Sequence, residues 1–388
     1  MWVVGLMSGT SADAVDAALV EWPAGADARP FELIAFREFP HPESLQSEIH
    51  RLAAGELEST EMLEELIRLD RVLADSFADA VHALLDDAGV NLSRVDGIAS
   101  HGQTVAHHPA RGGSLQIGCP ARLAERLHRP VIADFRRRDL AMGGEGAPLA
   151  PFFHHAVFAD ATETRGVLNL GGIANLTWLP AGGRPEDVMA FDVGPANTLL
   201  DGVVSLATEG RERFDRDGAL ARAGTPVSEW LDELLADPYL RRRPPKSTGR
   251  ERYGLAEARD WLARSRREGV ALADLLATLA HASTRAVAMA WESMTEGTAI
   301  EPGARLIVGG GGVRNGFVMD LLSDALKNVV VESMDAVGVP ADAAEAMAFS
   351  LLGRNTLCGI PNQLPQCTGV QEARILGVVH GGEWRSLD

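Results

Sequence analysis

The sequence has 388 residues and a mass of 41.4 kDa, which corresponds to two or three domains at roughly 150 residues each. Its 23% charged and 46% hydrophobic residues exclude wholesale disorder. The net charge of −18, from 36 basic and 54 acidic residues, disfavours binding to nucleic acid or to an anionic membrane. No apolar run reaches about 18 residues, so no membrane-spanning helix is predicted. The N-terminus lacks the positive region of a signal peptide, and the three cysteines are too scattered for a disulfide framework, so we expect a cytoplasmic protein.

The beginning of the chain has the pattern of a β-hairpin with a polar tip. Residues 2–7 form a short apolar run, residues 8–13 are rich in Gly, Ser, Thr and Asp, and residues 15–22 return to an apolar pattern. Backbone N–H groups and hydroxyls at such a tip can hold phosphate oxygens, and Asp13 is placed to reach a hydrated Mg²⁺. An ordinary polar turn uses the same residue types, so the pattern alone leaves both interpretations open.

The next elements alternate between helices and strands. Apolar residues at three- and four-residue spacing from Leu66 to Leu84 predict a helix, and residues 95–99 and 130–133 have strand patterns. We expect the first of these strands to end near Ser100 and to present the polar residues that follow. The histidines within residues 101–108 fit no zinc-site spacing, so metal binding by them is not expected.

Three arginines, Arg136 to Arg138, follow the second of these strands and stand between two aspartates. Strand ends are where α/β proteins place ligands, and arginine suits a carboxylate or a phosphate. A solvated run of charges is an equally good interpretation of this segment.

The second half of the chain repeats the opening pattern. Residues 167–170, the pair Gly171-Gly172 and residues 173–179 again have a strand–turn–strand pattern, which indicates two related α/β halves. Asp192 precedes a helix expected from near Asn197, so it is either a helix cap or a general base. A strand over residues 305–308 ends in four glycines, which either admit a ligand to the backbone or form a tight turn into a helix from about Phe317. Further helices are predicted over residues 275–289 and 342–352.

The sequence lacks the motifs of common kinases. Lysine occurs only at Lys246 and Lys327, and neither follows a glycine as a P-loop requires. Alternating strands and helices predict a layered α/β fold, with a boundary between the halves near residues 143–151.

Together these motifs resemble those of the anhydro-N-acetylmuramic acid kinases, a family of the sugar kinase/Hsp70/actin superfamily. The family usually has glycine at the positions of Ala14 and Ala196, and glutamine at that of Glu145. The matching segments run in register from residue 5 to about residue 350: residues 5–11 with Asp13 and Asp16, 101–104, 116–118, 134–139, 143–149, 169–175, 191–192 with 194–195, 245–251, 309–312 with Asn315, and 345–349.

The resemblance implies a two-lobed, ribonuclease H-like α/β fold with a central ATP cleft. We expect an N-terminal lobe of residues 1–145 and a C-terminal lobe of residues 146–388, with a C-terminal tail, about 360–388, able to pack back onto the first lobe. The implied site residues are the catalytic base Asp192; the ATP-binding residues Gly9, Thr10, Ser11, Ala12, Asp13, Ala14, Val15, Asp16, Gly171, Gly172, Gly309, Gly310 and Gly311; the substrate-binding residues Gln103, Thr104, Arg136, Arg138 and Glu345; and Asp13 as a ligand of Mg²⁺ through water.

The function implied by the resemblance is the ATP-dependent opening of 1,6-anhydro-N-acetylmuramic acid by water with phosphorylation of O6, in peptidoglycan recycling. The implied partners are ATP, Mg²⁺ and the anhydrosugar, and the implied assembly is a homodimer. Alternatives are a kinase of another anhydrosugar such as levoglucosan, an actin- or Hsp70-like ATPase without a sugar substrate, and a sugar-sensing regulator. The last is disfavoured because no helix-turn-helix with a basic face is recognisable.

Overall fold

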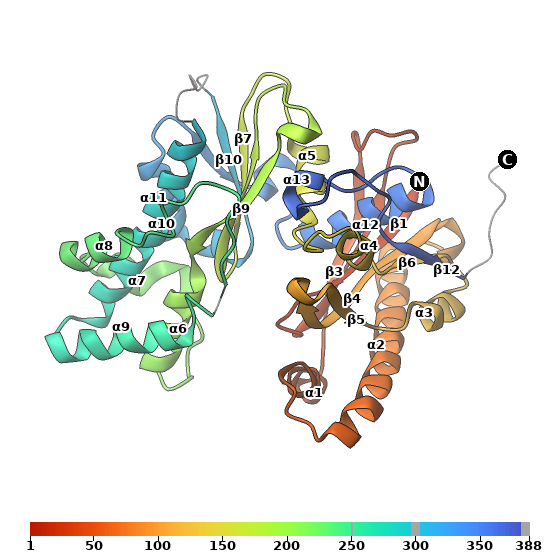
Figure 1. Ribbon diagram of the computed structural model, residues 1–388, viewed down its shortest axis with the longest axis horizontal. Coiled ribbons are helices and arrows are strands. Elements are labelled where there is room, and N and C mark those ends of the chain that lie inside the picture. Colours follow the sequence, from red (N-terminus) through yellow and green to blue (C-terminus); the bar gives the residue numbers. More distant parts are fainter. Residues whose placement is uncertain (250, 296–302, 382–388) are drawn as a thin grey trace. The chain divides into compact units, whose positions relative to one another are not determined.

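The computed structural model describes residues 1–249, 251–295 and 303–381, which form two compact units (Figure 1). Unit 1 comprises Met1–Val157 and Ala343–Asp388, and unit 2 comprises Phe158–Asp342. This division differs from the expected boundary at residues 145/146, and the return to the first unit begins at residue 343 instead of about 360. Arg250 and the last part of the expected tail, residues 382–388, lie outside the described residues.

Unit 1 is built on a mixed seven-stranded sheet. The first three strands form an antiparallel meander, and β4 and β6 run parallel to β1. Strand β5 pairs with β4, and β12 pairs with β6, both in antiparallel orientation. The strand order is β12-β6-β4-β1-β2-β3. The strands are β1 (Trp2–Ser8), β2 (Ala14–Glu21), β3 (Glu32–Pro40), β4 (Gly97–His108), β5 (Gly113–Ile117), β6 (Val131–Ala133) and β12 (Val378–His380).

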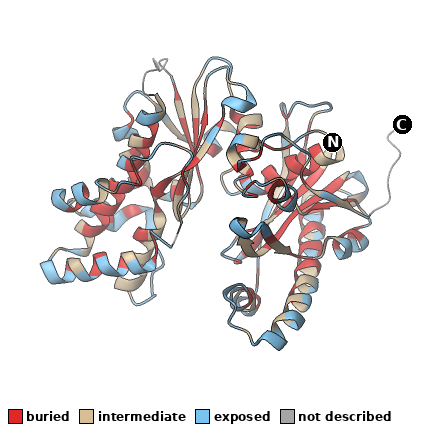
Figure 2. Ribbon diagram, in the orientation of Figure 1, coloured by how far each residue is buried: buried red, intermediate tan, exposed pale blue. Residues whose placement is uncertain are grey.

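The helices of unit 1 cover this sheet. The long helix α2 packs on β2, β3 and β5 through the apolar stripe that the sequence predicted, with Leu69, Leu73 and Phe77 buried in the core. Figure 2 shows buried residues along the strands and on the inward faces of the helices. The helices of four or more residues are α1 (Glu43–Ala54), α2 (Ser59–Ala88), α3 (Pro120–Leu127), α4 (Arg137–Ala141), α5 (Ala150–Phe158, ending at the boundary), α12 (Ala344–Leu357) and α13 (Pro365–Thr368).

Helix α12 explains why the chain returns to unit 1 earlier than expected. It crosses β1 and β4 so closely that a Cβ on Gly5 would lie 1.8 Å from the carbonyl oxygen of Ala346. The Nε1 atom of Trp22 also donates to the hydroxyl of Ser350 at 2.9 Å. Small residues allow this close approach of strand and helix, but their sequence pattern does not reveal which sheet the helix meets.

Unit 2 is built on a five-stranded sheet in the order β11-β10-β7-β8-β9. Its first three strands are again an antiparallel meander, and β10 and β11 again run parallel to the first strand. Both units therefore share the order third-second-first-fourth, followed by one further parallel strand, β6 in unit 1 and β11 in unit 2. This shared order confirms the predicted repeat and the two-lobed, ribonuclease H-like α/β fold. The strands are β7 (Arg165–Leu170), β8 (Ile173–Leu179), β9 (Met189–Pro195), β10 (Arg305–Gly309) and β11 (Val330–Ser333).

The core of unit 2 is built mainly around α10, which packs on α7, α8, α11 and β9. Its buried side chains include Leu275 and Leu279, as the spacing of its apolar residues predicted, and Trp291 beyond the predicted range. The helices are α6 (Asn197–Ala207), α7 (Ala219–Ala223), α8 (Ser228–Leu235), α9 (Leu255–Glu268), α10 (Leu272–Thr295) and α11 (Gly316–Ala325); short 3₁₀ turns over both units are Leu92–Arg94, Pro109–Arg111, Pro185–Asp187, Arg216–Gly218, Gly311–Arg314 and Met334–Val337.

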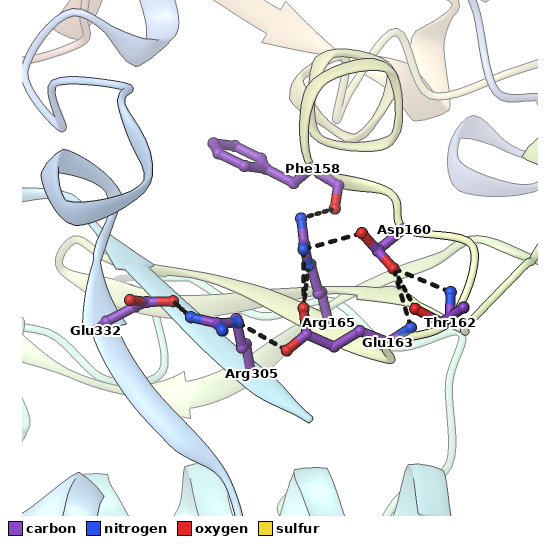
Figure 3. Close-up of polar contacts among 7 residues, drawn as sticks. All are labelled: Phe158, Asp160, Thr162, Glu163, Arg165, Arg305 and Glu332. Atoms are coloured by element: carbon purple, nitrogen blue, oxygen red, sulfur yellow. Dashed lines mark hydrogen bonds and ion pairs between the residues drawn. The ribbon is translucent and has the colours of Figure 1, made fainter. Parts of the chain in front are cut away.

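An ion-pair network joins the starts of the parallel strands of unit 2 (Figure 3). Arg165 on β7 and Arg305 on β10 are register partners, and Glu163 lies between them, accepting bonds of 2.8 and 2.7 Å. Arg305 also bonds Glu332 on β11 at 2.6 Å, and Arg165 bonds Asp160 at 3.1 Å. The network fixes the strand register at the end of the sheet opposite the glycine turns.

One local prediction was wrong. The strand expected to end near Ser100 continues to His108 as β4, with an irregularity between Leu6 and Ser8 in its pairing with β1. Gly102, at φ +74°, introduces the irregularity in β4, and β5 pairs with the extension. The strands and helices predicted at the other positions are present, although α2, α10 and α12 extend beyond their predicted ends by five to seven residues.

Candidate active site

The hairpin tip of unit 1 presents polar side chains to solvent. Thr10, Ser11 and Asp13 are exposed between β1 and β2, and Ser11 donates to Oδ1 of Asp13 at 2.6 Å. Helix α1 holds the tip, because Gln46 and His50 both lie within 2.9 Å of the carbonyl oxygen of Ser11. The tip is therefore a supported loop that exposes Thr10, Ser11 and Asp13, in line with the phosphate-binding interpretation.

The base of this hairpin is held by Gln103, which the resemblance assigned to the substrate. Its Oε1 accepts from the hydroxyl of Ser8 at 2.7 Å, and its Nε2 donates to the carbonyl of Gly9 at 3.0 Å. The side chain is fully buried, so both ends of the amide are used inside the protein. Thr104, the next residue, is half-buried and accepts from Gln116 at 3.0 Å.

The two alanines that depart from the family pattern cause no left-handed strain. In the hairpin the positive φ belongs to Ala12, at 50°, whereas Ala14 lies in β2 and Val15 follows it in the core. Ala196 has φ −123° at the start of α6. The left-handed backbone conformation in the tip is thus at Ala12, and neither Ala14 nor Ala196 adopts it.

Arg136 forms the centre of a polar cluster in unit 1. Its Nε donates to Nε2 of His101 at 3.0 Å, and its Nη1 donates to the carbonyl of Gly146 at 2.8 Å. Burial lowers the pKa of Arg136 to about 10, while the charges of Glu345 and Asp139 act in the opposite direction. Burial and Arg136 together hold the pKa of His101 well below its usual value, so this imidazole is neutral and accepts from the arginine.

The other predicted residues of unit 1 differ in their surroundings. Glu345 lies in the first turn of α12, is exposed, and interacts electrostatically with Arg136. Arg138 is exposed on α4 and donates to the carbonyl of Ile375 at 2.8 Å, so in this structure it supports the C-terminal segment. Among the described residues no group of three or more His, Cys, Asp or Glu could hold a metal ion.

The hairpin tip of unit 2 has a different chemistry. Gly171 and Gly172 join β7 to β8, and their carbonyl oxygens accept from the first backbone N–H groups of α6, at 3.0 to 3.2 Å. Asn197, the first residue of α6, also donates its side-chain amide to the carbonyl of Leu170 at 2.9 Å. The tip is therefore fixed against the start of a helix.

The glycine run after β10 lies directly beside this hairpin. A Cβ on Gly310 would lie 2.2 Å from Oδ1 of Asn169, and one on Gly312 would lie 2.6 Å from Cβ of Leu170. Gly310 has φ +77°, so glycine is required here for conformation as well as for space. The run ends at Asn315, whose side chain caps α11. The structure thus brings together the predicted residues 171–172 and 309–311.

Asp192 lies in the edge strand β9 and is the end of a polar row across three strands. Its Oδ1 accepts from Nδ2 of Asn175, its register partner on β8, at 3.0 Å, and Asn175 in turn accepts from Asn169 on β7 at 3.3 Å. Its Oδ2 accepts from the hydroxyl of Ser247 at 3.0 Å and from the N–H of Thr248 at 2.9 Å. The start of α6 is instead formed by Ala196, so Asp192 is not the cap of that helix.

Sequence reasoning quoted these supporting residues within motifs but assigned them no role. Asn169, Asn175, Ser247 and Thr248 all belong to segments that matched the family. Two features of the sequence could have pointed to them. In an antiparallel pair of β8 and β9, Asn175 lies opposite Asp192, and the chain has only two lysines, one of which, Lys246, precedes Ser247.

Comparisons with known proteins identify the family of the chain. The model of the family described as anhydro-N-acetylmuramic acid kinase matches residues 1–382 of the chain. The chain belongs to this family. Relatives named anhydro-N-acetylmuramic acid kinase include those of Gloeobacter violaceus, 42% identical over 97% of this chain and 98% of the relative, and of Caldanaerobacter subterraneus, 37% identical over 97% and 96%. A third, from Xanthomonas campestris, is 41% identical over 97% and 96%.

Solved structures resemble this kinase family member only distantly. The Acidaminococcus fermentans (R)-2-hydroxyglutaryl-CoA dehydratase component A has a TM-score of 0.46 at 11% identity, covering 90% of this chain and 96% of that one. A Streptomyces griseus ROK glucokinase in complex with glucose and AMPPNP has a TM-score of 0.40 at 12% identity, covering 92% and 100%. Within the described residues of the chain, no helix has both the length and the apolar character needed to cross a membrane.

Proposed function

We propose that this protein uses ATP and water to open 1,6-anhydro-N-acetylmuramic acid and to phosphorylate O6, giving N-acetylmuramic acid 6-phosphate and ADP in peptidoglycan recycling. Membership of the family supports this reaction, and the hydrogen bonds around Asp192 support its role as the base. The carboxylate is held from both sides by three donors among the described residues, whereas a carboxylate offers about four acceptor positions. We assign the remaining position to the attacking water.

In the proposed reaction Asp192 accepts a proton from a water that attacks the anomeric carbon. The bond from water oxygen to C1 forms while the bond from C1 to the bridging oxygen breaks. The bridging oxygen, which stays on C6, takes the γ-phosphoryl group as the bond to ADP breaks. One carboxylate thereby serves a hydrolysis and a phosphoryl transfer that share a single oxygen.

Two sets of residues are proposed to bind the phosphates of ATP. In unit 1 the set is Gly9 to Asp16, in which Thr10 and Ser11 are exposed, and in unit 2 it is residues 171–172 with 309–311, which offer glycine backbone. Arg136 and Glu345, with Thr104, are proposed to contact the sugar, whose lactyl carboxylate suits a guanidinium. Gln103 is proposed to act through the hairpin, because its amide is already occupied.

Asp13 fits a hydrated Mg²⁺. It is exposed, and the two described bonds to its carboxylate both go to Oδ1, from Ser11 and from the N–H of Ala14. The lack of a cluster of metal-binding side chains among the described residues suits an ion held chiefly by phosphates and water. When bound, Mg²⁺ neutralises charge on the phosphates during transfer.

The fate of the solvent oxygen tests the proposal. Turnover in ¹⁸O-labelled water is expected to place the label on the C1 hydroxyl and to leave the C6 ester oxygen unlabelled, as read promptly by mass spectrometry. Label in inorganic phosphate with unchanged sugar would instead identify an ATPase without sugar substrate. ADP release across a panel of anhydrosugars separates the remaining alternative, because a levoglucosan kinase would turn over a substrate that lacks the lactyl carboxylate.

We also propose a cytoplasmic homodimer. Support comes from the family resemblance and from the three cysteines, Cys119, Cys358 and Cys367, which are too few and too scattered along the sequence for a disulfide framework, as a reducing compartment favours. Light scattering on the purified chain tests the assembly: a mass near twice 41.4 kDa is expected, and a single-chain mass would contradict it.

A further inference from the structure

The short segment of residues 245–248 contacts Asp192 at three points. Ser247 and Thr248 donate to Oδ2 of the carboxylate, and the carbonyl of Lys246 accepts from the backbone N–H of Asp192 at 3.2 Å. Ser247 is exposed and Thr248 is half-buried, so neither is fixed by a deep apolar contact of its own. Something else must hold this segment in place against the edge strand.

Lys246 is the buried anchor of the segment. Only 7% of the residue is exposed, and its Nζ lies 3.1 Å from the carbonyl of Leu240 and 3.3 Å from that of Tyr239. The ammonium also lies 4.8 Å from the ring of Tyr239 and 5.7 Å from that of Phe191. A buried ammonium is costly unless donors and charge are satisfied, so these contacts give the side chain one defined position.

Hydrogen bonds connect Lys246 to Asp192 through Tyr239. Tyr239 accepts from the lysine through its carbonyl and donates its hydroxyl to the carbonyl oxygen of Asp192 at 2.9 Å. The ammonium thus connects the segment carrying Ser247 to the same residue that holds the backbone of the base. Burial and then Arg242 lower the pKa of Lys246 to about 8, while Asp192 and Asp237 act in the opposite direction.

We propose that Lys246 is a positioning residue of the reaction: its buried ammonium fixes residues 245–248 so that Ser247 and Thr248 hold the Oδ2 oxygen of Asp192. The inference rests on the proposed role of Asp192 as the base. Without the ammonium, the carboxylate retains the bond from Asn175 to Oδ1 and can rotate away from the line of proton transfer. Misplacement of a catalytic group by about 1 Å can cost on the order of 10²-fold in rate.

The kinetic test uses the two lysines of the sequence as a matched pair. Lys246→Met keeps the length of the side chain and removes the charge, and Lys327→Met removes the exposed lysine of the same unit. We expect kcat to fall about 10- to 100-fold in the first variant, with the KM for ATP changed less than about twofold, and no change in the second. An unchanged kcat, or a loss confined to the KM for ATP, overturns the proposal.

A double-mutant cycle separates positioning from a general structural role. If Lys246 acts through Ser247, the losses of kcat in Lys246→Met and Ser247→Ala should be strongly non-additive. Additive losses contradict the proposal. Lys246→Arg retains a buried cation and should recover part of the lost kcat, and it remains informative if the methionine variant does not fold.

Amide hydrogen exchange reports the same segment without any turnover. The N–H of Thr248 bonds Oδ2 of Asp192, so its protection should fall in Lys246→Met and stay at the wild-type level in Lys327→Met. Unchanged protection overturns the inference even if the substrate assignment is wrong. Conversely, a wild-type protein that releases no ADP with any anhydrosugar refutes the proposed function, while the exchange result still decides the role of Lys246.

Discussion

The two hairpins of this protein share a scaffold and differ in what their tips do. Both connect the first two strands of a sheet with the same strand order, and both end beside the strand that follows in parallel. The tip of unit 1 exposes Thr10, Ser11 and Asp13, whereas the tip of unit 2 directs the carbonyls of Gly171 and Gly172 to the start of α6. The repeated topology fixes where a turn lies, and the residues in the turn decide its chemistry.

The support behind each hairpin differs as well. In unit 1 a single buried glutamine, Gln103, holds the base of the hairpin. In unit 2 a row of side chains, Asn169 and Asn175, continues across the strands to Asp192. Disturbing the row of side chains that ends at Asp192 should therefore act on the chemical step, and disturbing the hairpin of unit 1 or its support by Gln103 should act on the nucleotide. The following variants test that division.

Asp192→Asn should give the largest effect, a loss of about 10² to 10⁴ in kcat, because the amide keeps the shape and cannot accept the proton. The fold should survive, since reorientation of the Asn175 amide can satisfy the new amide group. ATP binding by calorimetry should stay near that of wild type. Asp232→Asn, an exposed aspartate on α8, is the control. Retention of more than about a third of wild-type turnover would show that Asp192 is not the base.

Gly9→Val should raise the KM for ATP by roughly 10-fold or more, with a smaller change in the KM for the sugar, because the branched side chain fills space beside the exposed tip. The fold tolerates it, since a Cβ at Gly9 would meet only Ser11 Oγ, at 3.8 Å. Gly113→Val in β5, where a Cβ meets nothing within 4 Å, is the matched control. Calorimetry that finds equal ATP affinity in all three proteins would move the nucleotide site elsewhere.

Gln103→Leu should destabilise the protein by about 1 to 3 kcal/mol, because the Ser8 hydroxyl and the Gly9 carbonyl lose their buried partner. Its kinetic defect should appear in the KM for ATP, since the glutamine supports the phosphate hairpin. Denaturant unfolding and steady-state kinetics measure the two effects, with Gln371→Leu at an exposed position as the control. A defect confined to the KM for the sugar would instead indicate that Gln103 contacts the substrate directly.

Acid should act mainly on unit 1. Burial lowers the pKa of five histidines in this unit and of one, His281, in unit 2; those of unit 1 are His41, His101, His107, His154 and His380. Below about pH 6.5 the unfolded chain binds protons that the folded histidines resist, so stability is present above that pH and is lost as the pH falls.

Each such histidine contributes up to about 1.4 kcal/mol of lost stability per pH unit. Hydrogen exchange between pH 6.5 and 4.5, corrected for the intrinsic rate, should therefore show earlier opening of unit 1 than of unit 2. Replacing the buried His101 by Gln should reduce the slope for unit 1. Equal slopes in both units would contradict this account.

The local elements of this protein follow from its sequence. Apolar spacing predicted α2 and α10, and the two strand–turn–strand patterns predicted the hairpins at residues 2–22 and 165–179 to within a few residues. Such features are decided by neighbours along the chain, namely side-chain periodicity and the conformational freedom of turn residues. The motifs in register also identified the family, because each motif is a contiguous stretch of residues, and the roles of Asp192 and the glycine turns remain predictions from that family resemblance.

Long-range packing decided the rest. The sequence did not show that α12 returns to unit 1, because the close contact between Gly5 and Ala346 joins residues far apart in the chain. It also did not show that the side-chain amide of Gln103 is already hydrogen-bonded to the hairpin, or that Lys246 anchors the residues that donate to Asp192. A side chain's role depends on the donors and acceptors that surround it, and these come from strands and loops which only the folded structure brings together.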